Sequence, residues 1–196
     1  MRNPIITVAG PSGAGKTECL SRILKIRQDV LARAISSTTR KPRPKELEMN
    51  DPAYLFYPNL VFMAKVANGE FVETDQFAGN LYGTEKVVLE SIWKQDKIPV
   101  IALTLKGVEA IRHEYHSTMS IFLSPRSIDE LRARIKRRDE TISHKELSMR
   151  VAVAQFEIEQ HAKCCDHSII AGDGQVASMV RQLLWVVDGY ATDAKK

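Results

Sequence analysis

The sequence predicts an α/β protein whose parallel sheet is covered by helices on both faces, and three observations support this. First, short β-branched runs alternate with amphipathic segments, and strands joined through helices run parallel. Second, 196 residues with a 44% hydrophobic and 27% charged composition suit one globular domain. Third, a glycine-rich loop stands between the first expected strand and the first expected helix.

The apolar patterns place the elements of this layered core along the chain. We expect strands at 4–10, 30–36, 98–104, 117–125 and 167–170. We expect helices at 16–26, 84–97, 106–116, 127–140, 147–164 and 175–190. The helix that starts at Ser127 begins with a capping box, because Glu130 follows three residues later.

The segment between the second strand and residue 84 has a different character. Residues 36–52 are rich in proline and basic side chains, which predicts a surface loop. Short aromatic runs punctuated by glycine then predict small antiparallel strands, and a short helix is expected to end at Gly69. The runs are YLFY at 54–57, GEFVETDQF at 69–77 and GNLYGT at 79–84, and the helix covers 59–69.

The stretch VAGPSGAGKTECL, residues 8–20, matches the phosphate-binding pattern G-x-x-x-x-G-K-[ST], which indicates a P-loop NTPase-type sheet flanked by helices. Glycines let the backbone curl so that its N–H groups point inward, and the helix N-terminus adds positive potential. Lys16 is expected to contact the β- and γ-phosphates of a nucleoside triphosphate, and the Thr17 hydroxyl to bind Mg²⁺. The residues expected to bind this nucleotide are Gly10, Pro11, Ser12, Gly13, Ala14, Gly15, Lys16 and Thr17.

Composition and charge argue against several other classes of protein. A net charge of +4 with a pI near 9.0 suits anionic nucleotides and is too small to indicate nucleic-acid binding. No apolar run is long enough to predict a membrane span, and the first residues lack the features of a signal peptide. The three cysteines and five histidines show neither disulfide nor metal-ligand spacing. We therefore expect a reduced, cytoplasmic setting with no membrane or nucleic-acid partner.

Two further groups of polar residues indicate a second phosphate and a base. SSTTRKPRP at 36–44 contains Arg40 and Arg43, and guanidinium groups form forked hydrogen bonds to phosphate oxygens. A solvated basic turn is the alternative interpretation of this stretch. Glu73 stands in an apolar strand pattern, where a carboxylate is costly unless it is paired. It could accept from the two adjacent N–H donors on the edge of guanine.

The chain resembles the guanylate kinase family, which phosphorylates GMP or dGMP with MgATP. The resemblance rests on GPSGAGKT, SSTTRKPRP, GEFVETDQFAGNLYGT and SIFLSPRSIDELRARIKRR, and it extends from about residue 4 to residue 187. It implies a single domain over 1–196 that is divided into three parts. These are a core at 1–36, 88–132 and 151–190, a nucleoside-monophosphate-binding (NMP-binding) subdomain at 37–87 and a helical lid at about 133–150.

The resemblance also implies roles for individual residues. The residues implied to hold the acceptor phosphate are Arg40, Arg43, Tyr54 and Tyr82, and those implied to read guanine are Ser36, Glu73 and Thr84. In or beside the lid lie Arg134, Arg138 and Arg150, where arginines of the family clamp the ATP phosphates; a solvated basic face is the alternative. Lys16, the lid arginines and Mg²⁺ would neutralise the migrating phosphoryl group, so no protein nucleophile is needed.

Several positions depart from the family pattern. Where the family has two aspartates after the strand at 98–104, this chain has Ala102 and Thr104. The first aspartate normally lies near Mg²⁺, and the second helps to hold the guanine 2-amino group. Without their hydrogen bonds we expect a loss of activity of about ten- to a hundredfold. Thr104 can still accept a hydrogen bond and stays among the expected GMP-binding residues. KELEMNDPAY is about two residues longer than its family counterpart, and Ala171 replaces an asparagine near the adenine site.

Three hypotheses of function follow from these patterns. The leading one is a guanylate kinase, a monomer or homodimer that uses MgATP and GMP or dGMP. The second is a related kinase whose acceptor is a modified deoxynucleotide or a phosphorylated sugar, and Ala102 and Thr104 motivate it. The third is a non-catalytic interaction module, against which the intact Gly15-Lys16-Thr17 sequence speaks.

Overall fold

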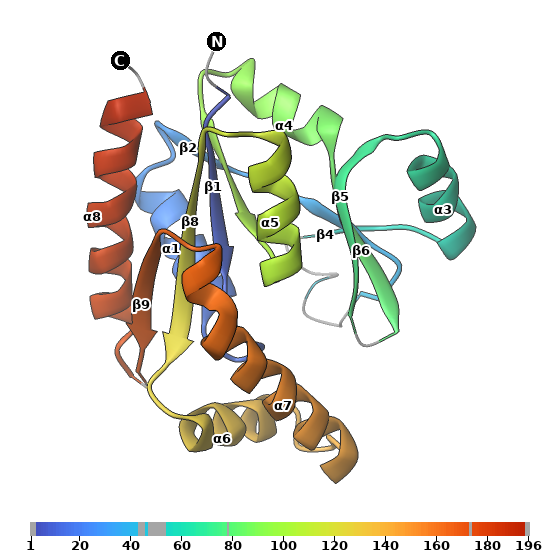
Figure 1. Cartoon of the computed structure of the whole chain (residues 1–196), viewed down its shortest axis with the longest axis vertical. Helices are drawn as coiled ribbons and strands as arrows, with labels where there is room; N and C mark the ends of the chain where they lie inside the picture. Colours follow the sequence, from blue (N-terminus) through green and yellow to red (C-terminus); the bar gives the residue numbers. More distant parts are fainter. Residues whose placement is uncertain (1–2, 43–45, 47–53, 78, 173, 195–196) are drawn as a thin grey trace.

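Figure 1 shows a computed structural model of the chain. The structure describes residues 3–42, 46, 54–77, 79–172 and 174–194. Arg43 and most of the KELEMNDPAY segment lie outside these residues, so what the sequence predicts for them stays a prediction. No helix in the described part of the chain is long and apolar enough to cross a bilayer.

A parallel sheet forms the centre of the molecule. Within the described residues it has five strands in the order β2-β7-β1-β8-β9, and every neighbouring pair is parallel. The strands are β1 (Ile5–Ala9), β2 (Leu31–Arg33), β7 (Ile98–Ala102), β8 (Thr118–Pro125) and β9 (His167–Ala171). Because β1 lies in the middle, the loop that follows it opens at the centre of the carboxyl edge of the sheet, where ligands of such folds bind.

Helices cover both faces of this sheet, as the sequence predicts. Alternate side chains of β1 point to opposite faces, so Ile6 and Val8 enter one apolar cluster while Ile5 and Ala9 enter another. The first cluster includes residues of α1 (Lys16–Ile26) and α8 (Val176–Ala194). The second includes residues of α4 (Lys86–Trp93) and α5 (Leu105–Glu114). Figure 1 shows α8 at one side of the sheet and α4 and α5 toward the other.

A smaller sheet projects beside the core, next to α5 (Figure 1). In the described residues its strand order is β4-β3-β6-β5, with β3 (Ser36–Thr38), β4 (Tyr54–Phe56), β5 (Phe71–Phe77) and β6 (Asn80–Glu85). The pairs β3–β6 and β5–β6 are antiparallel, as predicted, whereas β3 and β4 pair in parallel. The short helix α3 (Asn59–Ala67) ends just before Gly69, which has a positive φ of 66°.

The predicted strand at 30–36 is divided between the two sheets. β2 pairs with β7 in the core, and the Ala34 N–H still donates to the Val100 carbonyl oxygen at 3.0 Å. Two residues later, Ser36 begins β3 of the small sheet. The apolar run therefore marks a crossing point between the sheets, which a continuous β-pattern does not distinguish from one strand.

Two helices beyond β8 pack mainly on each other. They are α6 (Ile128–Arg138) and α7 (His144–Gln160), and α7 continues into the 3-10 helix η1 (His161–Lys163). Their shared apolar cluster is separate from the two core clusters and consists of Leu131, Ile135, Leu147, Val151 and Ala154. The predicted cap of α6 is confirmed, since the Ser127 hydroxyl oxygen accepts from the Glu130 N–H at 3.1 Å.

Candidate active site

The glycine loop connects β1 to α1 at the carboxyl edge of the core sheet. Gly10, Gly13 and Gly15 have φ values of 140°, 94° and 89°, which side-chain-bearing residues rarely adopt. A Cβ on Gly10 would also lie 2.5 Å from the backbone oxygen of Leu123 on β8. The loop is therefore held open by glycine and supported directly by the neighbouring strand.

Lys16 folds back over this loop from the first turn of α1. Its Nζ donates to the Pro11 carbonyl oxygen at 3.1 Å and to that of Gly10. Thr17, the next residue, is exposed on the same first turn. An ammonium group and a hydroxyl are thus brought to the mouth of the loop, beside the positive end of the helix.

Arg134 of α6 reaches the same loop from the helical pair. Its Nη1 approaches the Gly13 carbonyl oxygen at 3.4 Å, and its Nη2 donates to the Ala171 carbonyl oxygen at the end of β9 at 2.9 Å. The same guanidinium pairs with Glu130 on its own helix. Arg134, one of the predicted lid arginines, therefore reaches the phosphate loop.

Arg150, another of the predicted lid arginines, contacts its own helix in the described part of the structure. Arg150 pairs with Glu146, one helical turn earlier, at 2.6 Å. The side chain of Arg138 lies outside the described part of the structure. Their roles stay predictions.

On the small sheet, Arg40 lies over the aromatic rings of Tyr54 and Phe56. Its guanidinium carbon is 5.3 Å from the ring centroid of Tyr54, and the Tyr54 ring meets that of Tyr82 edge-on at 6.0 Å. Both terminal nitrogens of Arg40 donate to the Glu46 carboxylate at 2.8 Å, which raises the pKa of Arg40. The two guanidinium nitrogens that could bind a phosphate are thus paired with a carboxylate of this chain. Sequence reasoning did not single out Glu46.

Glu73 of β5 is a buried carboxyl group, only 6% exposed, as its apolar neighbours in the sequence suggested. The hydroxyl of Thr84, on the paired strand β6, donates to Glu73 Oε1 at 2.7 Å. Burial raises the pKa of Glu73 to about 7, and the nearby charge of Asp75 adds to this. Ser36, at the start of β3, is also nearly buried. The structure therefore joins Glu73 and Thr84 directly.

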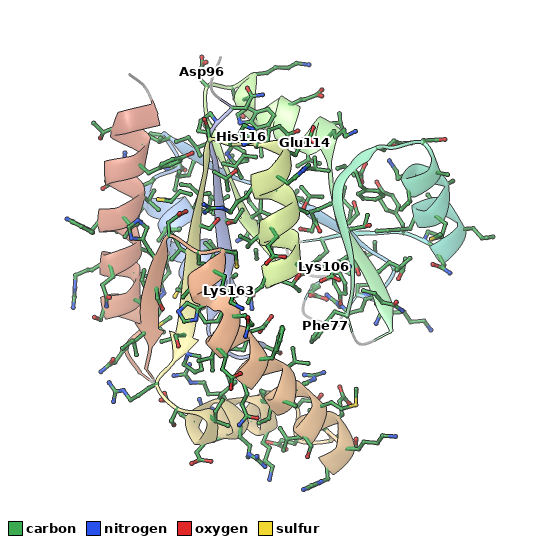
Figure 2. The ribbon with its side chains drawn as sticks, in the orientation of Figure 1. Phe77, Asp96, Lys106, Glu114, His116 and Lys163 are labelled. Atoms are coloured by element: carbon green, nitrogen blue, oxygen red, sulfur yellow. The ribbon has the colours of Figure 1, made fainter. Side chains whose placement is uncertain are left out.

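Thr104 occupies the N-cap of α5 and contacts the same small sheet. Its hydroxyl oxygen accepts from the Gly107 N–H at 3.2 Å and its hydroxyl donates to Asp75 Oδ2 at 2.6 Å. Asp75 was absent from the expected site residues. Its signal in the sequence was the spacing of two from Glu73, which places both side chains on one face of a strand. Figure 2 labels Lys106, at the start of α5, and Phe77, at the end of β5, near one another in this view.

Glu157 of α7 is a second carboxyl group that sequence reasoning missed. Burial raises its pKa, the charge of Lys16 opposes that rise, and the charge of Asp75 adds to it. The Glu157 carboxyl group therefore interacts electrostatically with Lys16 of the phosphate loop and with Asp75 of the small sheet. Ala102, at the end of β7, offers no side-chain ligand. No group of three or more metal-binding side chains occurs within the described ranges.

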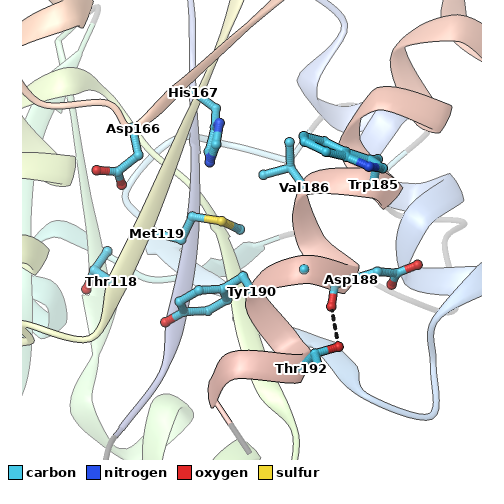
Figure 3. Close-up of a pocket in the computed structure, with 10 residues that line it drawn as sticks. Thr118, Met119, Asp166, His167, Trp185, Val186, Asp188, Tyr190 and Thr192 are labelled. Carbon is cyan, nitrogen blue, oxygen red and sulfur yellow. Dashed lines mark hydrogen bonds between the residues drawn. The ribbon is translucent and has the colours of Figure 1, made fainter.

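A surface groove lies at the opposite end of the core sheet (Figure 3). Met119 from its wall pairs with Ile6 near the amino end of β1, whereas the phosphate loop follows Ala9. The α8 side of the groove includes Trp185, which is 78% exposed, and Tyr190. The groove is therefore separate from the phosphate-binding elements.

The fold and the site together define a P-loop nucleotide kinase: a phosphate loop at the centre of a parallel sheet, a basic helical pair beside it and a group of buried polar side chains on the neighbouring small sheet. A sequence model of guanylate kinase matches residues 1–189. The chain is 34% identical to the guanylate kinase of Sus scrofa over 154 residues, which are 79% of this chain and 76% of that protein. It is 35% identical to the guanylate kinase of Nostoc sp. over 173 residues, 88% and 84% of the two chains. The chain belongs to the guanylate kinase family.

A solved structure supports the fold independently. The guanylate kinase of Anaplasma phagocytophilum superposes with a TM-score of 0.74 at 21% sequence identity, covering 95% of this chain and 85% of that one. The predicted α/β class with a second small sheet is confirmed.

Proposed function

We propose that this protein is a guanylate kinase that transfers the γ-phosphoryl group of MgATP to GMP or dGMP. The observation that supports this most is the pairing of an intact phosphate loop with a buried, threonine-bonded carboxylate on the neighbouring sheet. A triphosphate and a guanine base are the ligands that these two features suit. The cytoplasmic setting and the monomeric or homodimeric state stay predictions of the sequence.

The donor would bind at the phosphate loop, between α1 and α6. The loop N–H groups and the helix N-terminus would hold the phosphates, and Lys16 would exchange its two carbonyl partners for phosphate oxygens. Arg134 is close enough to the loop to add a second cation as the helical pair closes. Arg138 and Arg150 are proposed as further lid cations. Charge spreads over the transferred phosphoryl oxygens, so fixed cations there stabilise the transition state.

Magnesium fits this arrangement through Thr17. Mg²⁺ in kinases is typically held by one or two protein oxygens together with substrate phosphates and water, so a cluster of carboxylates is not required. The exposed Thr17 hydroxyl beside the loop can supply one such oxygen. When bound, the ion neutralises phosphate charge and polarises the transferred group.

The acceptor would bind across the small sheet. Arg40, Arg43, Tyr54 and Tyr82 are proposed to hold its phosphate, with the bidentate Glu46 pair of Arg40 giving way to phosphate oxygens. Ser36, Glu73, Thr84 and Thr104 are proposed to line the base. In the ionised form Glu73 is an acceptor only, which matches the N1–H and 2-amino donors of guanine and mismatches adenine.

The experiment is product analysis after incubation of the protein with MgATP and GMP. We expect GDP and ADP in equal amounts, no product with AMP, and loss of both products in Lys16→Met. If wild-type protein releases ADP without GDP, or gives GDP at the same rate after Lys16→Met, the proposal fails.

A further inference from the structure

Position 104 has a threonine where the family resemblance expects an aspartate, and the structure shows what faces it. The Thr104 hydroxyl donates to Asp75 Oδ2 at 2.6 Å. Position 104 has no carboxylate of its own, but its side chain is hydrogen-bonded to the carboxylate of Asp75. This carboxylate comes from β5 of the small sheet instead of from the end of the core strand.

The direction of this hydrogen bond is fixed by its partners. The Gly107 N–H can only donate, so the Thr104 oxygen accepts from it as the N-cap of α5. Its own proton must then go outward, to the acceptor-only carboxylate of Asp75. Thr104 thus ties the start of α5 to β5 and holds the Asp75 side chain in one orientation.

Asp75 shares a strand face with Glu73, the proposed base-reading carboxylate. Residues two apart on a strand point the same way, with Cα atoms roughly 7 Å apart. Both side chains are shielded, Glu73 at 6% exposure and the Asp75 side chain at 17%. The charge of Asp75 contributes to the raised pKa of Glu73, which agrees with their proximity.

Asp75 also retains capacity to accept from a ligand. A carboxylate offers about four lone-pair positions. Thr104 uses one on Oδ2, and the Gln76 N–H uses one on Oδ1 at 2.8 Å. Lys106 Nζ is 3.5 Å from Oδ1 and 74% exposed, so this pair is loose and screened by solvent.

We propose that Asp75 is a specificity-determining residue that accepts a hydrogen bond from the guanine 2-amino group, positioned for this by Thr104. The inference rests on the proposed function and adds a second carboxylate to the proposed base-binding residues. Glu73 would accept from N1–H and one 2-amino hydrogen, and Asp75 from the other. A carboxylate on β5 would thus take the place of the one that the family resemblance expects at position 104.

The test compares GMP with inosine monophosphate, which is the same nucleotide without the 2-amino group. We expect Asp75→Ala to lower kcat/KM for GMP by about ten- to a hundredfold and that for inosine monophosphate much less, so that the preference for GMP shrinks. Asp75→Asn tests the charge with the shape retained, and it should reduce the preference in the same direction. Thr74→Ala, an exposed change on the opposite face of the same strand, should leave the preference unchanged.

A second-site change gives the sharpest readout. Thr104→Asp in the Asp75→Ala background returns a carboxylate to the N-cap of α5 and should restore the preference for GMP, which a merely structural role of Asp75 would not predict. If wild-type protein prefers GMP and neither Asp75 variant changes that preference, the inference is wrong while the proposed function stands. If wild-type protein does not phosphorylate GMP, the proposed function fails and the inference with it.

Discussion

Replacing Glu73 by glutamine removes a charge from a nearly dry position while keeping the shape of the side chain. The pKa of Glu73 is about 7 in the folded chain, against an ordinary 4.5. The folded state therefore holds this proton more tightly than the unfolded state. Its stabilising contribution is complete below pH 4.5 and is lost as the pH rises through 7.

The size of the effect follows from those two values. One pKa unit corresponds to about 1.4 kcal/mol, so complete titration costs about 3 kcal/mol, of which about 2 kcal/mol falls between pH 5 and pH 8. Glutamine does not titrate. We therefore expect the unfolding free energy of Glu73→Gln, relative to wild type, to rise by about 2 kcal/mol over this interval.

The assay is urea unfolding followed by circular dichroism at pH 5, 6, 7 and 8. Titrating groups common to both proteins cancel in the difference, so the comparison isolates Glu73. Glu90→Gln, which removes an exposed carboxyl group on α4, serves as the matched control and should show no such trend. A constant difference between Glu73→Gln and wild type across the pH range would refute the burial argument.

The remaining predictions concern ligands and turnover. Lys16→Met should lower kcat by about a hundredfold or more with an unchanged circular dichroism spectrum, because a fixed cation at the transferred phosphoryl group is lost; unchanged turnover would remove Lys16 from the mechanism. In calorimetry, Glu73→Gln should weaken GMP binding and leave ATP binding nearly unaltered, whereas equal losses would mean that the carboxylate is structural. Arg40→Lys should raise the KM for GMP by about tenfold or more, since an ammonium cannot form the forked pair; an unaltered KM would contradict a phosphate contact.

Much of the fold could be predicted from local patterns. The phosphate loop is specified by residues within one short stretch, because glycine conformations and a helix N-terminus are local properties. The need of Glu73 for a partner was also predictable, since a carboxylate among apolar strand residues is costly unless paired; that Thr84 is one partner is seen only in the structure. The division of residues 30–36 between two sheets could not be predicted from the sequence, because it depends on which distant strands pair with each half.

Two contacts of the candidate site that sequence reasoning missed are long-range. Asp75 meets Thr104 across 29 positions of the chain, and Arg134 meets Gly13 across 121. Motif matching assigns a role to each position separately, so it indicates only that Thr104 lacks the carboxylate of the family's aspartate. The folded chain shows that a carboxylate faces that threonine from another strand.

The most direct measurement is ADP release from MgATP with GMP, dGMP, AMP, dTMP, UMP and CMP, each supplied alone. We expect turnover with GMP and dGMP and little with the other four, because Glu73 and Asp75 are proposed to accept hydrogen bonds from the guanine edge. No ADP release with either guanine nucleotide, together with turnover on another acceptor, would contradict the proposed function.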